Sequence, residues 1–481
     1  MGTTTKPFDL QKANVLLATA GFFFACFLSG CAKQPYIAKP LSPQHTSAKI
    51  ANKNPLSIDF KAFCQRQGYT KALPFEAWGL DELTLSALYH HTKLDVSKAQ
   101  LGVAKAAIES AGLKTAPSLG ANVARSNRAN GDIRPFAYGL NVEIPIETGN
   151  KRQLRIEEAQ QLAEAARLDV AETAWQLRSQ LAKDWLDYQQ HVARVTVLQT
   201  ALTQQQNYQA LMQKRLNLGL ASSAEVALAN TQLAKMQTNL SAEKNKKAML
   251  INQLAIDAGL SLASFEQIKI ASFNIETQLQ ISHAFFADAK NLDDLQAQAL
   301  LNRIDLRRSL ANYAAAETRI KLEVAKQTPD FAITPGFAFE FGDKIWSLGF
   351  ASLLNLLQTL PTQIAEAEAL RRVEGAQFEA LQARIIGQVS QAKAEYAAAL
   401  NGFEMAKNQQ NQQDAWLAKT KKQFDAGLLD RLEMTQAELQ NNLFTEEILQ
   451  QQLNILRAAD ALEDVLQRDL QSKLFQSKLF D

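Results

Sequence analysis

The sequence predicts a mainly helical α+β fold that contains two copies of one unit, each with a β-hairpin and a long, coiled-coil-like helical hairpin. Three observations predict it. Only 20 glycines and 12 prolines occur in 481 residues, separated by long stretches rich in Ala, Leu, Gln, Glu, Lys and Arg, which is typical of long helices. Short runs of alternating apolar residues interrupt these stretches. The same succession of patterns recurs at a shift of about 210 residues.

Matching positions stand in the same order in both halves of the chain, which chance does not explain. They are Leu94-Asp95 with Ile304-Asp305, Pro117 with Pro329, Gly139 with Gly349, Ile156 with Ile364, and Gly219-Leu220 with Gly427-Leu428. We therefore divide the chain into a signal segment (1–30), a lipidated N-terminal extension (31–78), a first repeat (79–268), a linker (269–290), a second repeat (291–470) and a flexible tail (471–481).

Each half reads as one helix, two strands and then two long helices. In the first half we expect a helix over 82–116 that stops before a proline. Residues 151–218 contain neither glycine nor proline, so as a helix they would be on the order of 100 Å long. The other expected elements are strands near 119–123, 136–144, 331–341 and 346–350, and helices over 220–258, 362–426 and 428–470.

Helices of that length have no core of their own and must pair side by side, through seams such as Leu198 with Leu202. The expected strands alternate, carry aromatic residues and are roughly ten residues long, which is the length of a tilted outer-membrane strand. Four strands cannot close a barrel, and free edges cannot face lipid. The sequence therefore requires several copies to share one barrel, without giving their number.

The N-terminus has the order of an export signal. Lys6 and Lys12 precede an apolar run over 15–28, which is short for a membrane span. The run closes with Leu28-Ser29-Gly30-Cys31, which resembles the bacterial lipobox. That resemblance implies cleavage before Cys31 and acylation of its thiol, with chains such as palmitate, and Ala32 suits transport to the outer membrane. A membrane anchor followed by a chance match is the alternative.

Composition and motifs argue against catalysis and nucleic-acid binding. The formal net charge is only +2, whereas nucleic-acid partners call for a strong basic excess. The five histidines are scattered, with no cysteine or carboxylate at ligand spacing. No phosphate loop or nucleophile motif occurs. We expect no catalytic residue, no metal site, no cofactor and no enzymatic activity. Cys64 has no intrachain partner in the exported chain and is expected to be a small buried hydrophobe.

Two stretches carry a family resemblance. They are "FAYGLNVEIPIETGNKRQLRIEEAQ" (136–160) and "KRLNLGLASSAEVALANTQL" (214–233), the latter echoed by "KKQFDAGLLDRLEMTQAELQ" (421–440). With the duplicated order, over roughly 75–470, the chain resembles the TolC-like outer-membrane efflux factors. The resemblance implies a homotrimer with a twelve-stranded barrel in outer-membrane lipid and an α-helical tunnel in the periplasm. It also implies a periplasmic adaptor (membrane fusion protein) and a proton-driven inner-membrane efflux pump, so that the chain is a passive exit channel.

The resemblance assigns roles to two helix breaks and to one acidic stretch. The adaptor-docking tips would be Arg215, Gly219, Leu220, Ser222, Ser223, Gly427, Leu428 and Leu429. The alternative is that the two glycines merely end helices in a left-handed conformation. A periplasmic gate would use Asp414 and Asp425, against the alternative of solvated outer-face carboxylates.

The exported substrate and the functional class of the protein remain open at this point. The turn over 145–156, "PIETGNKRQLRI", resembles the branch of the family associated with heavy-metal cation pumps, but the second half lacks this wording. Metal cations therefore stand beside drugs and other small molecules as substrates. The main rival function is a periplasmic coiled-coil structural lipoprotein that forms no pore, and an envelope enzyme is a more distant one. The first leaves the two alternating hairpins unexplained, and nothing in the sequence supplies the chemistry of the second.

Overall fold

The computed structural model describes residues 36–69, 73, 75–127, 135–288, 292–340, 342–352 and 360–468. The chain divides into two units, 1–50 and 51–481. Helix α2 (Pro43–Ala51) occupies the described part of the first unit. The predicted signal segment, Cys31 and the predicted tail lie outside the described residues.

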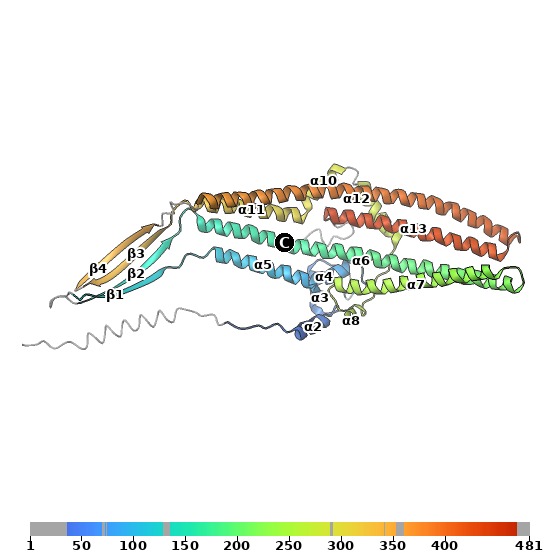
Figure 1. Ribbon diagram of the computed structural model, residues 1–481, viewed down its shortest axis with the longest axis horizontal. Helices are drawn as coiled ribbons and strands as arrows, with labels where there is room; N and C mark the ends of the chain where they lie inside the picture. Colours follow the sequence, from blue (N-terminus) through green and yellow to red (C-terminus); the bar gives the residue numbers. More distant parts are fainter. Residues whose placement is uncertain are drawn as a thin grey trace, which may run out of the picture. The chain divides into compact units, whose positions relative to one another are not determined.

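The second unit repeats one order of elements, as predicted (Figure 1). The first half contains α4 (Leu80–His90), α5 (Thr92–Ala111), β1 (Ser118–Arg125), β2 (Phe136–Ile146), α6 (Lys151–Asn217) and α7 (Ser223–Asp257). The second half contains α10 (Leu292–Asn302), α11 (Ile304–Ala325), β3 (Phe331–Glu340), β4 (Asp343–Ser352), α12 (Leu360–Asp425) and α13 (Arg431–Leu466). Helix α3 (Ile58–Arg66) precedes the first half, and α8 (Leu262–Phe265) and α9 (Ile275–Asp288) lie between the halves.

The predicted continuous helix over 82–116 is wrong. The chain breaks between α4 and α5 at His91, whose backbone is extended and whose Nδ1 accepts a hydrogen bond from the Lys93 amide at 3.1 Å. Gly259 packs against this break so closely that a Cβ there would lie 2.7 Å from the His91 nitrogen. Helix α5 then ends at Ala111, before Gly112. The position of the break is therefore set by tertiary contact with the end of α7. Local sequence patterns do not reveal that contact.

The long helices lie in a layer of side-by-side rows. Helix α6 is flanked by α5 and α7 on one side and by α11 and α13 on the other, and α12 packs against α11 and α13 (Figure 1). Helices α6 and α12 contain 67 and 66 residues. Within the hairpin α6–α7 the seam is apolar, with Leu198 and Val195 packed on Leu240 and Leu202 beside them. The predicted seam is confirmed.

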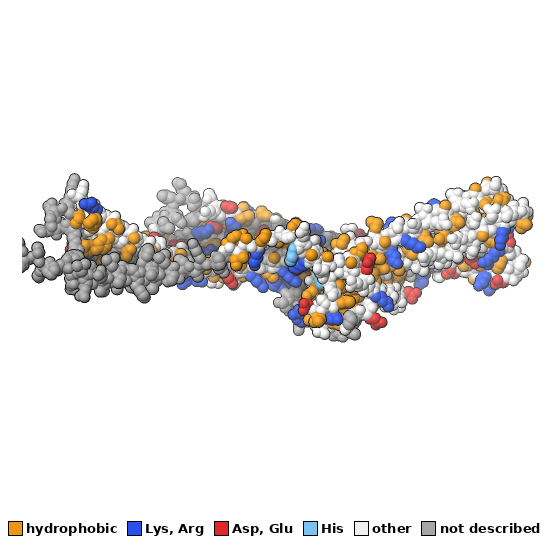
Figure 2. Space-filling view, turned by 90° about the horizontal axis from the view of Figure 1, so that it is seen from below, with side chains coloured by type: hydrophobic (Ala, Val, Ile, Leu, Met, Phe, Trp, Pro, Cys, Tyr) orange, Lys and Arg blue, Asp and Glu red, His pale blue; other side chains and the backbone are white. Residues whose placement is uncertain are grey.

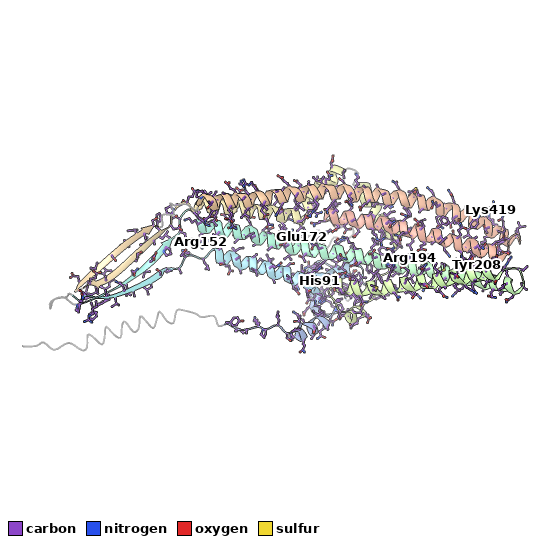
Figure 3. The ribbon with its side chains drawn as sticks, in the orientation of Figure 1. His91, Arg152, Glu172, Arg194, Tyr208 and Lys419 are labelled. Carbon is purple, nitrogen blue, oxygen red and sulfur yellow. The ribbon has the colours of Figure 1, made fainter. Side chains whose placement is uncertain are left out.

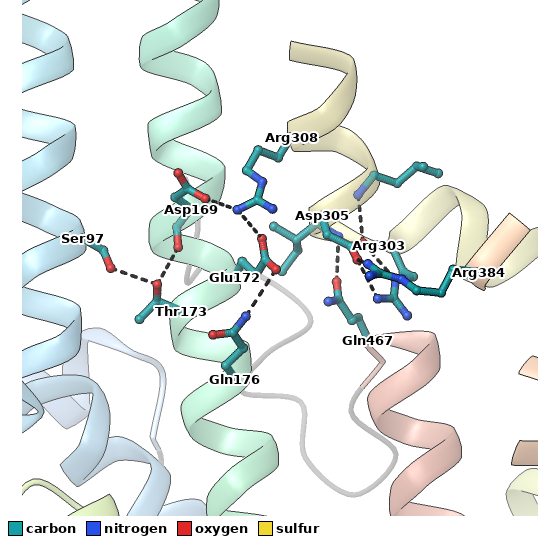
Figure 4. Close-up of polar contacts among 12 residues, drawn as sticks. Ser97, Asp169, Glu172, Thr173, Gln176, Arg303, Asp305, Arg308, Arg384 and Gln467 are labelled. Atoms are coloured by element: carbon teal, nitrogen blue, oxygen red, sulfur yellow. Dashed lines mark hydrogen bonds and ion pairs between the residues drawn. The ribbon is translucent and has the colours of Figure 1, made fainter. Parts of the chain in front are cut away.

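Polar contacts hold α6 to its neighbours on both sides (Figure 4). From α11, Arg308 pairs with Asp169 and with Glu172, the latter at 3.0 Å. From α5, the Ser97 hydroxyl lies 2.9 Å from that of Thr173. These contacts hold α6 against α11 of the second half and against α5 of the first half.

Residues 51–78, which form the second part of the predicted extension (31–78), contribute apolar side chains to a core. Phe60, Cys64 and Trp78 are fully buried there with residues of α4 and α7. Trp78 exchanges two backbone hydrogen bonds of 2.8 Å with the segment that follows α8. Burial raises the pKa of the Cys64 thiol to about 12, so the thiol stays protonated and is a buried hydrophobe, as predicted.

The four strands form one antiparallel sheet in the order β1-β2-β3-β4. Its register gives two different faces. On one face exposed and half-buried apolar residues are aligned, as in Val123–Tyr138–Phe339 and Leu140–Phe337–Trp346, and Figure 2 shows apolar side chains gathered over the strands. On the other face small and polar residues are aligned, as in Gly120–Asn141–Gly336–Ser347.

A polar junction joins the sheet to α6. The buried Lys151 ammonium donates to the Thr328 carbonyl at 2.6 Å and to Asp330 at 2.8 Å. The Thr148 amide also donates to Asp330, at 2.8 Å. Burial works against the charge of Asp330, but these hydrogen bonds hold its pKa below the usual range. The junction therefore stays charged at neutral pH and loses its contribution only as the pH falls below the ordinary range of an aspartate.

We predict that Lys151→Met lowers the free energy of unfolding by about 2 kcal/mol, because it leaves the Thr328 carbonyl and Asp330 without their buried donor. Thermal unfolding of the purified chain, followed by circular dichroism at neutral pH, measures the loss as a lower Tm. Lys244→Met, at an exposed position of α7, is the matched control. Equal Tm values for the two variants would contradict the assigned role.

Candidate functional site

The two tips, residues 215–223 and 423–430, share one backbone geometry. Gly219 and Gly427 have φ of +72° and +71°, a left-handed conformation that favours glycine. In each tip the next amide closes a six-residue turn: Leu220 donates to the Arg215 carbonyl at 2.8 Å, and Leu428 to the Gln423 carbonyl at 2.9 Å. These are glycine-terminated helix ends. The alternative reading of both glycines as helix terminators is therefore confirmed.

Each turn leads into a capped helix three residues later. Ser222 caps α7 and Asp430 caps α13, and each forms a reciprocal capping box with the glutamate three residues on, Glu225 or Glu433. Ser223 is the first residue of α7. The equivalence of the two tips thus extends from sequence to hydrogen bonds.

The tips expose leucines that helix termination does not require. Leu218, Leu220 and Leu428 are 73%, 64% and 74% exposed, although the residue after such a glycine commonly packs back on its own helix. Leu429 is partly buried. Leu220 and Leu428 stand at equivalent places on the two hairpin ends, which is the arrangement of an apolar contact surface.

An ion pair connects the two tips. Arg215, at the end of α6, donates to Asp430 at 2.6 Å. Backbone hydrogen bonding to Glu433 and the charge of Arg215 hold the pKa of Asp430 below its usual range. The pair is therefore charged at neutral pH and is lost only at strongly acidic pH. Beside it, Leu432 packs against a small cluster around Met212.

The same polar character continues along the joint between α6 and α13. Arg194 pairs with Glu446 at 2.7 Å and Arg457 with Asp187 at 2.7 Å, and Gln436 donates to the Tyr208 hydroxyl at 3.3 Å. Figure 3 marks Arg194 and Tyr208 on α6 along this joint. Ion pairs and side-chain hydrogen bonds thus line the joint between the two hairpins, beside an apolar cluster that includes Leu186 of α6 and Leu453 and Leu456 of α13.

The candidate gate carboxylates both lie on α12. Asp414 is exposed and accepts from Gln410 at 2.8 Å, and Asp425 is exposed as the last residue of the helix. Eleven residues separate them, or about three turns, so they share one face of the helix. Lys421 falls on the same face between them, so this face is mixed in charge.

The turn "PIETGNKRQLRI" makes contacts within the chain. Arg155 forms a two-pronged ion pair with Glu147, and Arg152 donates to the carbonyl of Gly112 at 2.6 Å. Together with Lys151 these residues bind the end of α5 and the start of β3 to the start of α6. Lys151, Arg152 and Arg155 therefore have a structural role that accounts for the motif.

Asp430 is the residue of this region that sequence reasoning missed. It both caps α13 and connects the tips. The pattern Asp430-Arg431-Leu432-Glu433 is a capping-box signal, so the cap was readable from the sequence. The ion pair with Arg215 was not readable from the sequence, because Arg215 lies more than 200 residues away.

Comparisons with known proteins agree with this geometry. Residues 83–258 match the family model "Outer membrane efflux protein". The outer membrane protein VceC from Vibrio cholerae is 18% identical, with a TM-score of 0.64 over 82% of this chain and 97% of that one. CusC is 16% identical, with a TM-score of 0.62 over 91% and 99% of the two chains. The Campylobacter jejuni CmeC outer membrane channel is 14% identical, with a TM-score of 0.61 over 91% and 94%. No curated protein matches the sequence.

The fold is therefore that of the TolC-like outer-membrane channels, and a family match over part of the first repeat accompanies it. The resemblance inferred from the sequence is confirmed. Within the described residues, no helix is long and apolar enough to cross a membrane.

We predict that Arg215→Gln loosens the connection between the tips. An exposed pair contributes under about 1 kcal/mol, so amide exchange in residues 215–225 and 426–434 should rise by up to roughly fivefold. Hydrogen–deuterium exchange with mass spectrometry measures this. Arg372→Gln, at an exposed position of α12, should leave both peptides unchanged; unchanged exchange in Arg215→Gln as well would rule out a restraining role for the pair.

Proposed function

We propose that several copies of this chain close into one hollow cylinder that serves as the outer-membrane channel of a tripartite efflux system. A periplasmic adaptor and an inner-membrane pump deliver the substrate, and the channel conducts it passively. One observation carries the proposal: the sheet and the helical layer end in open edges on the same two sides. Strand β1 and helices α5 and α7 form one edge, and β4 and α12 form the other (Figure 1).

The sheet edges support closure by further copies. β1 and β4 each lack a neighbour on one side within the described sheet. Open edges cannot face lipid, because their backbone groups would lose water without gaining a partner. The strands have 8 to 11 residues, close to the length that spans an outer membrane. The apolar face suits lipid, and the face of small and polar residues suits a water-filled interior.

Both helical edges expose mostly small residues at heptad spacing. On α5 the exposed residues at alternating spacings of three and four include two valines: Val96, Ala99, Val103, Ala106 and Ser110. On α12 the exposed residues at the same spacing are almost all small: Ala369, Val373, Ala376, Ala380, Ala383, Gly387, Ala394 and Ala397. A Cβ on Gly387 would meet nothing within 4 Å in this chain. Two edges of mostly small residues with interspersed valines allow helices of neighbouring copies to pack closely at heptad spacing.

The remaining components rest on the resemblance and on the tips. Three copies would give a twelve-stranded barrel with the helical layer as a periplasmic tunnel. The exposed leucines of the two tips, with Arg215, Ser222, Ser223 and Leu429 beside them, would meet the adaptor. The acyl chains on Cys31 would anchor the assembly in the outer membrane. Asp414 and Asp425 would surround the tunnel axis near the tips and favour cations.

We predict that a double variant, Val103→Cys with Ala369→Cys, forms covalent multimers with a bismaleimide. Val103 lies eight residues from the strand end of α5, and Ala369 nine from that of α12, so both stand at the same height in the layer. Cys64 is buried and protonated. Each single variant is a control that cannot link unlike edges. A double variant that stays monomeric on denaturing gels would refute closure through these edges.

We predict that Gly219→Pro or Leu428→Asp abolishes efflux while the oligomers still assemble. Proline cannot adopt the positive φ of Gly219, and Asp removes an apolar contact at the tip. Resistance of complemented cells measures efflux, and native gels measure assembly. Ile58→Asp, at an exposed position of α3, is the control. Normal resistance in both tip variants would end the docking assignment.

The rival function is a coiled-coil lipoprotein of the periplasm that forms no pore. That function does not explain the sheet, because a face of apolar residues opposite a face of small and polar residues has no role in a protein that stays in water. Single-channel conductance of the purified chain in a planar bilayer separates the two functions, since the rival gives none. Growth of a deletion strain on metal salts and on drugs then distinguishes the substrate classes that the turn over 145–156 leaves open.

A further inference from the structure

A cavity of about 570 Å³ lies in the body of the chain, away from the tips and the sheet. Residues 75–82, α6, the segment 271–282 and α13 surround it. Its volume is within the range of small-molecule sites. Its lining is acidic and aromatic. The carboxylates are Glu76, Asp81, Glu82, Asp460 and Glu463, the rings are Tyr69, Phe75, Trp185 and Phe273, and no Lys, Arg or His is among the described residues that line it.

Partners within the chain satisfy two of these carboxylates. Glu82 accepts from the Gly79 amide at 2.9 Å and from the Tyr69 hydroxyl. Glu463 pairs with Arg178, and both side chains are buried. These two carboxylates therefore have a structural role in the lining of the cavity.

Asp460 differs from them. It is largely buried, and no described residue donates a hydrogen bond to it. Burial raises its pKa to about 6, against the attraction of Arg178 and Lys183. At neutral pH it is therefore mostly ionised and lacks a hydrogen-bonded partner. On the same lining, the buried Oε1 of Gln278 also has no hydrogen-bond partner among the described residues. Two acceptors to which no described residue donates a hydrogen bond thus line one cavity.

Unsatisfied acceptors beside aromatic rings define the complementary ligand. A carboxylate and an amide oxygen attract a cation that can donate hydrogen bonds, and ring faces attract the same cation through their quadrupoles. The acidic lining disfavours anions. Within the described residues no group of three or more His, Cys, Asp or Glu side chains could hold a metal ion, which favours an organic cation.

We propose that this cavity binds a small organic ammonium ion with an aromatic or other apolar stem. Asp460 pairs with the ammonium group, Gln278 accepts a hydrogen bond from it, and Trp185 and Phe273 contact the stem. The site is separate from the tips, the sheet edges and the candidate gate, so it does not depend on conduction.

Isothermal titration calorimetry of the full-length chain in detergent tests the proposal, with 2-phenylethylammonium as the probe. We expect saturable binding, and none for 2-phenylethanol or phenylacetate, which share the ring but are neutral and anionic. Asp460→Asn keeps the shape of the side chain and should weaken binding at least tenfold. Phe273→Leu should weaken it through the loss of the ring. Glu266→Gln, at an exposed position outside the cavity, should bind as the unaltered chain does.

Three results would overturn the proposal. One is the absence of saturable binding of the cation, and another is equal binding of the neutral or anionic analogue. The third is unchanged affinity in Asp460→Asn, provided that its Tm shows a folded chain. A Lys71→Ala variant is measured in parallel, since Lys71 follows Tyr69 in the sequence and lies outside the described residues. Binding that appears only in that variant would mean that the chain supplies its own cation, and would also overturn the proposal.

Discussion

Unpaired edges are the constraint on which the rest of the structure depends. β1 and β4 do not pair with each other, so the described sheet is not closed into a barrel. The outer helices expose apolar residues at heptad spacing on the same two sides. A single chain can satisfy neither layer, because strand edges need backbone partners and long helices need neighbours. Both needs are met by the same operation, the addition of another copy. The proposed channel follows from this shared geometry more than from any single residue.

The joints within the helical layer combine apolar clusters with ion pairs. The seam of the first hairpin contains an apolar cluster, and His191 and Arg194 of α6 pair with Glu243 of α7 across it. The joint between the hairpins combines exposed ion pairs, each of which contributes little because water competes for the charges, with an apolar cluster that includes Leu453 and Leu456. Among the described contacts, the tips are joined by such a pair together with one small apolar cluster. Separating the hairpins along their full length would therefore expose apolar side chains to water as well as break ion pairs.

Helix composition, strand alternation and the two glycine breaks predicted the element order, because each depends on residues close in sequence. The left-handed glycines at 219 and 427 and the cap at Ser222 follow from local backbone chemistry. The prediction of a single helix over 82–116 was wrong because Gly259, distant in sequence, packs on His91. The burial of the aromatic residues of 51–78 was likewise not readable from the sequence, since they pack against helices that they meet only in the fold.

The sequence by itself determined which segments are helices and strands and that the chain is duplicated, and it predicted an assembly of more than one copy. These depend on periodicity and on the backbone's requirement for hydrogen-bond partners, which hold in any tertiary arrangement. Only the tertiary structure decided which side chains meet: Arg215 with Asp430, Lys151 with Asp330, and Asp460 with a cavity. Each of these depends on the packing of segments far apart in the chain, and short-range patterns carry no information about that packing.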